Sequence, residues 1–335
     1  AHWRCVFAND FDPKKASAYI ENWGGGEMQV GDVRDVSADQ IPTAALDLAW
    51  ASFPCQDLSL AGVGAGLAGD RSSSFWFFWE RMKELCADGR PPKMIVLENV
   101  AGTLTSHEGD DFRSIVQASV ELGYDIGALT IDAQLFVPQS RQRVFFVAVL
   151  RADSERLSLG VKKPSDTWCS ASLKRAHEGL PPKLQRRWIW WSMPAPEPRR
   201  SRFADLIEDQ PASVKWHSVA ETNRLLRMMS PRNRAKVEGA KKAGKRMVGG
   251  MYRRMRRENG KSVQRVEVRF DDVAGCRRTP GGGSSRQTII VVEGDTVRSR
   301  LISARETARL MGLPDAYKLP ARYNDAYHLT GDGVV

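Results

Sequence analysis

The chain has 335 residues, of which 42% are hydrophobic, and this is enough for one large core and a second, smaller domain. No apolar run approaches the roughly 20 residues that span a bilayer, and no signal peptide opens the chain, so we expect a cytoplasmic protein without membrane attachment. The formal net charge of +10 indicates a polyanionic partner, most naturally nucleic acid. Five cysteines are scattered without metal-ligand spacing, which argues against a disulfide framework and against a zinc site.

Residues 1–150 alternate short apolar strands with helical stretches, a pattern typical of a doubly wound, mostly parallel sheet. We expect the first strand over 5–8, ending at Asp10 and Phe11, and a helix with proline in its first turn over 13–22. An acidic residue at a strand end of such a fold commonly binds ribose hydroxyls, which makes Asp10 a candidate.

The next short strand is expected over 28–30 and leads into Gly31, Asp32 and Val33. Taken alone, this is an ordinary glycine–aspartate turn. The largely apolar run 46–51 then leads into the tripeptide Pro54-Cys55-Gln56. A cysteine after a strand is usually a small buried hydrophobic residue, so Cys55 becomes informative only beside its neighbours.

Residues 55–69 hold four glycines and little apolar periodicity, which predicts a mobile loop. A helix is expected over 73–86, and its aromatic cluster, 75–79, is interpreted as core.

Glu98 and Asn99 follow an apolar strand expected over 94–97. Sites of open α/β sheets lie at the carboxyl ends of strands, where Cys55 and Glu98 both fall, although such a carboxylate could simply cap the next helix. The segment 139–143 contains Gln139, Arg141 and Arg143 and precedes a strand expected over 144–150. Alone, these arginines could form a solvated turn.

The pattern changes at about residue 151. Proline clusters, the aromatic run 188–191 and an Arg/Lys-rich segment, 224–269, replace the regular alternation up to about 285. The basic stretch 232–257 can track phosphates, or it can be a solvated, partly disordered loop. The tryptophans of 188–191 could wedge into DNA, but a packed core of the small domain is the favoured interpretation.

The last 50 residues return to regular elements. The glycine-rich segment 277–288 suits a phosphate or a DNA strand and lacks the ending of a P-loop. It leads into a strand expected over 289–292. Ser303 and Glu306 satisfy a capping box at the start of an apolar helix, 308–313.

The three clusters 54–56, 98–100 and 139–143 resemble, in this order, the catalytic core of the DNA (cytosine-5) methyltransferases. The resemblance implies an S-adenosylmethionine-dependent methyltransferase fold, with a catalytic domain over 1–150, a target-recognition domain over 151–285 and a return segment over 286–335 that packs on both. It also implies that Cys55 attacks C6 of a flipped cytosine, that Glu98 acts at N3, and that Arg141 and Arg143 orient both. Gln56, Asn99 and Gln139 are the expected substrate-binding residues.

The same resemblance implies the cofactor residues. Asp10 would hold the ribose of S-adenosylmethionine, Phe11 would stack on adenine, and Asp32 and Val33 would bind the adenine edge. Pro54 and Ser74 complete the expected set. Members of this family begin with a strand and a Phe-x-Gly-x-Gly turn, and this chain starts just past that motif; it also stops within the last motif, at 331–335. We therefore expect a fragment that lacks the first strand.

Three functions remain open at this point. The first is a monomeric bacterial or phage methyltransferase of double-stranded DNA, solitary or paired with a restriction endonuclease and located in the cytoplasm at the nucleoid. The second is a tRNA cytosine-5 methyltransferase on the same scaffold, against which the large basic insertion argues. The third is a DNA-binding remnant without catalysis.

Overall fold

The computed structural model describes residues 3–53, 74–157, 159–276 and 286–335, with the side chains of 155–157 left out. The chain forms two compact units. Unit 1 comprises 1–132 and 142–195, and unit 2 comprises 133–141 and 196–335. Pro54, Cys55 and Gln56, the whole of the glycine loop 55–69, and the glycines of 277–285 lie outside the described residues.

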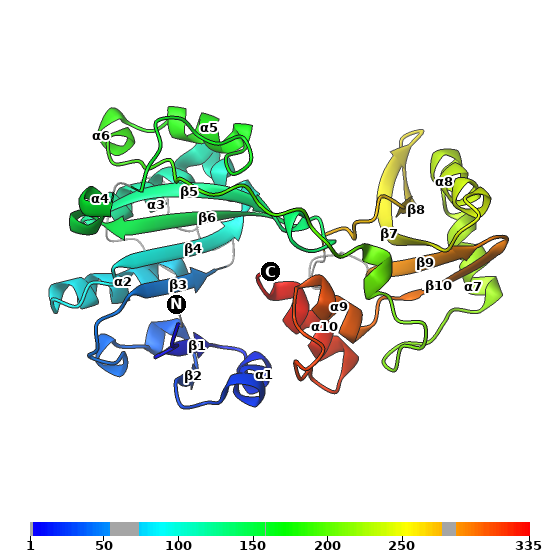
Figure 1. Ribbon diagram of the computed structural model, residues 1–335, viewed down its shortest axis with the longest axis horizontal. Coiled ribbons are helices and arrows are strands. Elements are labelled where there is room, and N and C mark those ends of the chain that lie inside the picture. The colour runs from blue at the N-terminus through cyan, green and yellow to red at the C-terminus, as the bar shows by residue number, and fades with distance from the viewer. Residues whose placement is uncertain (1–2, 54–73, 158, 277–285) are drawn as a thin grey trace. The chain divides into compact units, whose positions relative to one another are not determined.

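Unit 1 contains a four-stranded sheet in the order β3-β4-β6-β5 (Figure 1). Its strands are β3 (Leu48–Ser52), β4 (Met94–Val100), β5 (Tyr124–Asp132) and β6 (Gln142–Leu150). β3 is parallel to β4, and β6 is antiparallel to both β4 and β5. Three of the four strands therefore run in the same direction, which confirms the expected α/β fold with a mostly parallel sheet.

The first two strands pair with each other. β1 (Ala8–Asp10) and β2 (Met28–Val30) form a separate parallel sheet. The expectation of a strand over 5–8 was wrong by about three residues. Apolar side chains suggested the earlier span, but the parallel ladder begins at Ala8, and the Asn9 side chain reinforces it by donating to the carbonyl of Gln29 at 3.1 Å.

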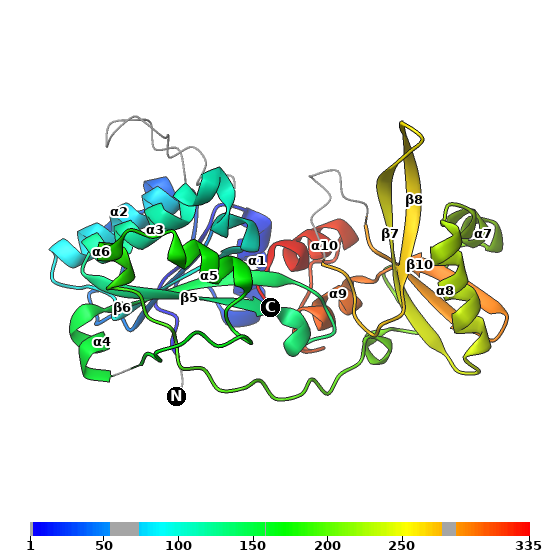
Figure 2. The ribbon, with the colours of Figure 1, turned by 90° about the horizontal axis from the view of Figure 1, so that it is seen from above.

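Six α-helices of unit 1 are described, of which the expectations over 13–22 and 73–86 are met by α1 and α2. They are α1 (Pro13–Trp23), α2 (Ser74–Ala87), α3 (Asp110–Glu121), α4 (Arg151–Leu157), α5 (Ala171–Glu178) and α6 (Pro182–Gln185). Asp12 caps α1 by accepting from the backbone of Lys14, and Pro13 occupies the first turn. α2 and α3 lie along the same face of the four-stranded sheet (Figure 2).

The aromatic cluster of α2 is core, as expected. Phe75 and Trp79 are buried and stack with ring centroids 5.7 Å apart. On the sheet, Phe146 of β6 packs against Phe112 of α3, with centroids 5.8 Å apart. This burial fixes the position of β4, the central strand whose end carries Glu98.

The segment 151–195 belongs to unit 1, whereas we expected a domain boundary at residue 150. Backbone hydrogen bonds tie it to β5: Ile126 donates to Arg187 at 3.1 Å and accepts from Ile189 at 2.8 Å. Gly127 makes this approach possible, because an added Cβ would meet the Ile189 carbonyl oxygen at 1.9 Å. Apart from the short segment 133–141, the chain therefore stays in unit 1 up to residue 195.

The tryptophan run packs in unit 1, where Trp191 is buried and Trp188 and Trp190 are half-buried. The ring of Trp188 lies 5.6 Å from that of Phe112 and 5.4 Å from that of Trp190. His177 contacts both tryptophans, with centroid distances of 5.2 and 4.7 Å. The expectation of a packed core therefore holds only in part, since two of the three rings are half-buried, and its placement in the small domain was wrong.

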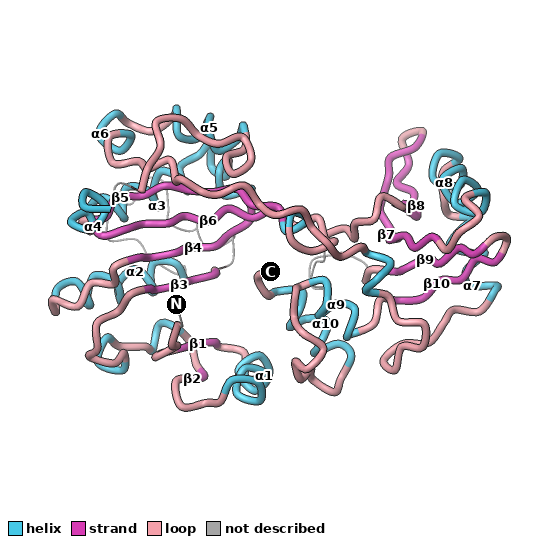
Figure 3. The backbone as a smooth tube through the Cα atoms, in the orientation of Figure 1, coloured by secondary structure: helices cyan, strands magenta, loops and turns pink. Residues whose placement is uncertain are grey.

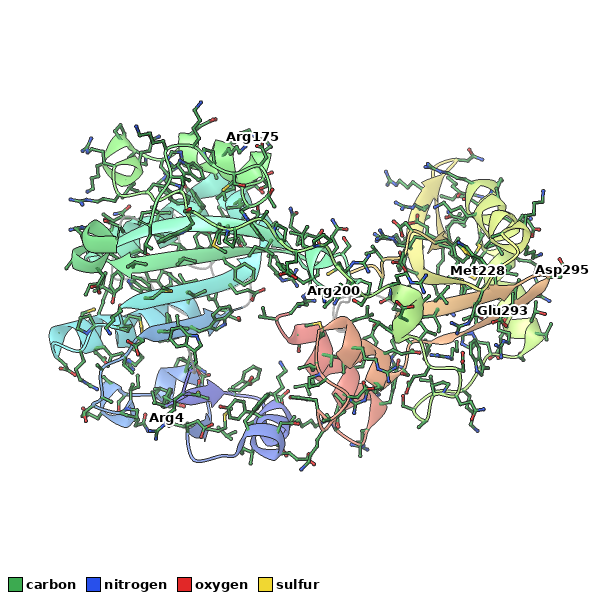
Figure 4. The ribbon with its side chains drawn as sticks, viewed as in Figure 1. Arg4, Arg175, Arg200, Met228, Glu293 and Asp295 are labelled. Atoms are coloured by element: carbon green, nitrogen blue, oxygen red, sulfur yellow. The ribbon has the colours of Figure 1, made fainter. Side chains whose placement is uncertain are left out.

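Unit 2 is built on an antiparallel sheet in the order β10-β9-β7-β8 (Figure 3). Its elements are α7 (Val219–Arg227), α8 (Pro231–Lys242), β7 (Met247–Glu258), β8 (Lys261–Arg269), β9 (Thr288–Glu293), β10 (Thr296–Leu301), α9 (Ala304–Leu310) and α10 (Tyr323–Asp332). The basic stretch 232–257 is thus largely a helix and a strand in place of a disordered loop. Figure 4 labels Glu293 and Asp295 beside the tight β9–β10 turn at Gly294.

Two hydrophobic clusters hold unit 2 together. One contains Val248, Ile289 and Val291 of the sheet with Leu310 and Tyr327 of α9 and α10. The other joins Met251, Val266 and Val268 to α7 and α8 through Leu225 and Val237. Both faces of the sheet are therefore covered near its centre.

Candidate active site

The carboxyl end of β4 carries the central pair of the candidate site. Arg143 lies opposite Val100, two residues beyond Glu98, so both side chains project from the same face of the sheet. Arg143 Nε lies 2.9 Å from Glu98 Oε1, and the two side chains are 15% and 9% exposed. A nearly buried carboxylate with a guanidinium partner at the end of a sheet strand is an arrangement suited to chemistry on a bound base.

Asn99 anchors the segment that leads to Cys55. Its Nδ2 donates to the carbonyl of Phe53 at 3.0 Å, and its Oδ1 accepts from the backbone of Val100 at 2.8 Å. The side chain is buried. Phe53 is the last described residue before Pro54 and Cys55, so Asn99 ties this segment to the strand that carries Glu98.

Gln139 and Arg141 belong to unit 2, whereas Glu98 and Arg143 belong to unit 1. Gln139 Nε2 donates to the carbonyl of Leu310 at 2.8 Å. Arg141 Nη2 donates to the carbonyls of Gly331 and Gly333, at 3.2 and 2.8 Å, at the C-terminal end of α10, where a cation is favoured. Both side chains are buried and hold the last two helices within unit 2.

The carboxyl edge of β1 and β2 carries four of the expected cofactor residues, Asp10, Phe11, Asp32 and Val33. Asp10 pairs with Val30, and its carbonyl accepts from the backbone of Gly31 at 3.1 Å, so Asp10 and Asp32 leave neighbouring parallel strands at the same edge. Phe11 follows Asp10 and its side chain is 74% exposed. Two carboxylates and an accessible aromatic ring match the hydroxyls, amino group and flat base of a nucleoside.

Asp32 is held as a carboxylate. It caps the short helix at 33–35 by accepting from the backbone of Arg34 at 2.9 Å, and its Oδ2 lies 2.8 Å from Arg34 Nη2. The hydrogen bond from the Arg34 guanidinium lowers the pKa of Asp32. Val33 is the first residue of that helix, and Ser74 is the first residue of α2.

Two functional neighbours escaped the sequence interpretation. Arg34 fixes Asp32, and Asn9 Nδ2 donates to the carbonyl of Gly31 at 3.0 Å, which fixes the turn between the strand and Asp32. The ion pair of Asp32 with Arg34 could have been predicted, because an acidic and a basic residue lie two positions apart in the sequence. The role of Asn9 could not, because it depends on the pairing of β1 with β2. In the described part of the chain, no group of three or more His, Cys, Asp or Glu residues could hold a metal ion. Nor is any described helix sufficiently long and apolar for a membrane span.

Comparison with known proteins gives a match to one family over the whole chain. The family described as C-5 cytosine-specific DNA methylase matches residues 1–335. Type II methyltransferase M.BsuFI of Bacillus subtilis is 35% identical over 145 residues, which are 43% of this chain and 33% of that protein. M.HaeII of Haemophilus aegyptius is 29% identical and matches 65% of this chain and 63% of its own length. The matched regions thus span less than two thirds of either relative.

A longer alignment and the solved structures agree with this match. M.HpaII of Haemophilus parainfluenzae is 25% identical over 99% of this chain and 79% of its own length. The crystal structure of Dnmt2 methyltransferase from S. pombe covers 99% of this chain and 87% of that chain, with a TM-score of 0.56 and 16% identity. The Entamoeba histolytica methyltransferase EhMeth gives a TM-score of 0.57 at 13% identity, with 98% of this chain and 85% of that chain covered. At such identities the structural likeness shows the fold alone.

Proposed function

Because this chain belongs to the C-5 cytosine-specific DNA methylase family, we propose that it transfers a methyl group from S-adenosylmethionine to C5 of a cytosine in double-stranded DNA. The observation that carries this proposal is the Glu98–Arg143 pair at the end of β4, joined through Asn99 to the segment that leads to Cys55. The reacting cytosine must leave the base stack, since the thiolate attacks a ring face that is covered within the duplex.

The reaction begins with covalent addition. The Cys55 thiolate forms a bond to C6, Glu98 in its protonated form gives its proton to N3 and becomes the carboxylate, and the electron pair gained by the ring makes C5 a nucleophile. When bound, S-adenosylmethionine supplies the electrophilic methyl group that C5 attacks. A base then removes the proton from C5, the C6–S bond breaks, and the N3 proton returns to Glu98. Cys55 leaves as a thiolate, so the enzyme is regenerated.

Arginines position these groups. Arg143 contacts Oε1 of Glu98, and we assign Oε2 to the pyrimidine edge. Arg141 is a positioning residue that keeps the neighbouring chain in place by holding the end of α10. Gln56 and Gln139 remain proposed substrate-side residues, Gln139 acting through its contact with α9.

The residues at the edge of β1 and β2 would hold the cofactor. Asp10 accepts from the ribose hydroxyls, the exposed ring of Phe11 covers the adenine, and Asp32 accepts from its amino group. We place the amide of Val33, Pro54 and the start of α2 at Ser74 on the remaining cofactor surface.

The expected setting follows from this activity. We propose a monomer that acts on DNA in the bacterial or phage-infected cytoplasm, with a companion restriction endonuclease as an open partner. The tRNA alternative gains no support from the Dnmt2 likeness, which concerns the fold alone. A non-catalytic DNA-binding remnant stays the opposing hypothesis.

Transfer of labelled methyl from S-adenosylmethionine to plasmid DNA and to tRNA tests the proposal. DNA methylation should be abolished by Cys55→Ala and kept by Cys276→Ala, a matched loss of an exposed thiol. A duplex with 5-fluorocytosine should become covalently attached to the chain, because fluorine cannot leave C5 as a cation, and Cys55→Ala should prevent attachment. Transfer to tRNA alone would support the second function, and duplex binding without either reaction would support the remnant.

A further inference from the structure

The β7–β8 hairpin of unit 2 extends beyond its sheet. The two strands pair from Gly250–Arg269 to Glu258–Lys261, but β9 pairs with β7 only as far as Met251. Asn259 and Gly260 close the hairpin with φ angles of 49° and 76°. Positive φ at both residues is typical of a two-residue hairpin turn, because it matches the right-handed twist of the strands. The distal half is therefore a two-stranded ribbon, and Figure 2 shows it projecting beyond the rest of unit 2.

The two faces of this ribbon have the same net charge but differ in their acidic residues. Side chains alternate along a strand, and directly paired residues share a face. One face, here called the paired face, carries two carboxylates among four cations, namely Glu258 and Glu267 with Arg254, Arg256, Lys261 and Arg265. The opposite face, here called the reading face, carries Arg253, Met255, Arg257, Ser262 and Gln264.

The arginines of the paired face form ion pairs with carboxylates. Arg254 Nε lies 3.5 Å from Glu267, Arg256 also pairs with Glu267, and Arg265 pairs with Glu258. These ion pairs cross from strand to strand and stabilise the ribbon. They also reduce the charge that this face can offer to a polyanion.

The reading face has no acidic residue and is open to solvent. Met255 is 57% exposed, and Arg253, Arg257, Ser262 and Gln264 are exposed as well. Within the described part of the chain, no ion pair is formed by Arg257. A solvent-exposed methionine between two arginines adds nothing to the core of unit 2, so this face is suited to a partner.

The chemistry of the reading face matches the edges of base pairs. The major groove of B-DNA admits a two-stranded ribbon; there arginine binds guanine with its fork, glutamine binds adenine, and an apolar side chain contacts the thymine methyl. The major groove of A-form RNA is too deep and narrow for side chains to read. Shape, charge and side-chain types therefore favour duplex DNA as the occupant.

We propose that the reading face enters the major groove beside the target cytosine and selects the neighbouring base pairs, with Arg257, Met255 and Gln264 as specificity-determining residues. This inference rests on the proposed function, since it assumes a DNA substrate. The paired face then turns away from the bases and keeps the ribbon straight.

Adjacent arginines of β7 provide a matched test. Arg257→Ala and Arg256→Ala each remove one positive charge from the same strand, but from opposite faces. A random duplex library would be incubated with the full chain and with each variant. The duplexes that bind and, in a separate experiment, those that become methylated would be recovered and sequenced. Arg257→Ala should weaken the preference at one or more base pairs by about fivefold or more, whereas Arg256→Ala should leave every preference within about twofold. Met255→Ala and Gln264→Ala should each alter a different position.

Arg257→Lys separates base contact from charge. Lysine keeps the attraction to phosphates but lacks the guanidinium fork, so this variant should lose the preference and keep the salt dependence of binding. Unchanged preferences in Arg257→Ala, equal changes in both alanine variants, or a wild-type chain without any base preference would overturn the inference. Binding preferences altered as expected, without methylation by the wild type, would instead sink the proposed function alone. Thermal unfolding of each variant checks that the exposed substitutions leave the fold intact.

Discussion

Each unit contains a glutamate paired with an arginine, and the two pairs are built for different purposes. In unit 1, Glu98 meets Arg143 through one contact at 2.9 Å, with both side chains slightly exposed. In unit 2, Glu306 and Arg300 have no exposed side-chain surface. Both pairs lie at the end of a strand, so the difference comes from the surrounding hydrogen bonds.

Both oxygens of Glu306 are fully engaged. Arg300 donates to Oε2 at 2.8 Å and to Oε1 at 2.5 Å. The backbone of Glu208 also donates to Oε1, and that of Ser303 to Oε2, each at 2.7 Å. Trp216 covers the guanidinium of Arg300, 4.8 Å from the ring centroid. Burying this pair is tolerated because the two charges neutralise each other and both carboxylate oxygens are hydrogen-bonded, although Arg300 Nε has no hydrogen-bond partner among the described residues.

The contrast shows how the two carboxylates can be told apart. A structural glutamate uses its accepting capacity within the chain, whereas Glu98, among the described residues, has Arg143 as its charged partner and keeps capacity for a ligand. Removing either carboxylate should therefore affect a different property of the protein.

The largest expected effect on activity comes from Glu98→Gln. The amide keeps the shape of the side chain but cannot deliver a proton to N3, so methylation should slow on the order of 10²- to 10⁴-fold. Its melting temperature should fall by no more than a few degrees, because the glutamine oxygen can still accept from Arg143 although the site is nearly buried. Single-turnover methylation and calorimetry measure the two properties. Glu80→Gln, at a surface pair with Lys83, is the control, and activity within threefold of wild type in Glu98→Gln would remove Glu98 from the mechanism.

Glu306→Gln should show the opposite pattern, with stability lost first. It leaves the buried guanidinium of Arg300 without its counter-charge, so the free energy of unfolding should fall by about 3–5 kcal/mol. Urea denaturation measures this change. The double variant Arg300→Met/Glu306→Leu removes both charges and should regain most of the lost stability. A fall below about 1 kcal/mol in the single variant would mean that this pair contributes little.

Arg143→Lys sharpens the comparison at the first pair. Lysine keeps a positive charge near Glu98 but cannot fix the carboxylate with a planar fork. We expect kcat/KM to fall about tenfold while thermal stability is retained. The matched control is Arg151→Lys, at a second arginine–carboxylate contact of unit 1, which should methylate normally. Equal activity in the wild type and Arg143→Lys would show that only the charge matters.

The sequence predicted the local parts of these arrangements and missed the distant ones. The strand before Glu98 and the capping box of Ser303 and Glu306 were readable, because each depends on neighbouring residues. The contacts of Arg141 were not, since its partner Gly331 lies 190 residues later and in a different part of the pattern. The burial of Arg300 was missed for the same reason. It depends on a hydrogen bond from the backbone of Glu208 to Glu306, two residues that are 98 positions apart in the sequence. The place of Cys55 relative to Glu98 stays a prediction, because it falls outside the described residues.

The smallest expected effect is a dependence of stability on pH, from a histidine beside the buried pair of unit 2. His217 follows Trp216, its Nδ1 lies 3.0 Å from Ser299 Oγ, and burial lowers its pKa from the ordinary value of 6.5. The unfolded chain therefore takes up this proton at a higher pH than the folded chain. The contribution is complete above pH 6.5 and is lost as the pH falls from there through the folded-state pKa. Since the ring is only half-buried, the loss should be below about 1 kcal/mol.

Urea denaturation at pH 7.5 and pH 5 should show a smaller difference in the free energy of unfolding for His217→Gln than for the wild type. The control His328→Gln, at an exposed histidine of the same unit, should leave this difference unchanged. If His217→Gln shows the same difference in the free energy of unfolding between pH 7.5 and pH 5 as the wild type, protonation of His217 does not destabilise unit 2, and its acid sensitivity arises from other groups.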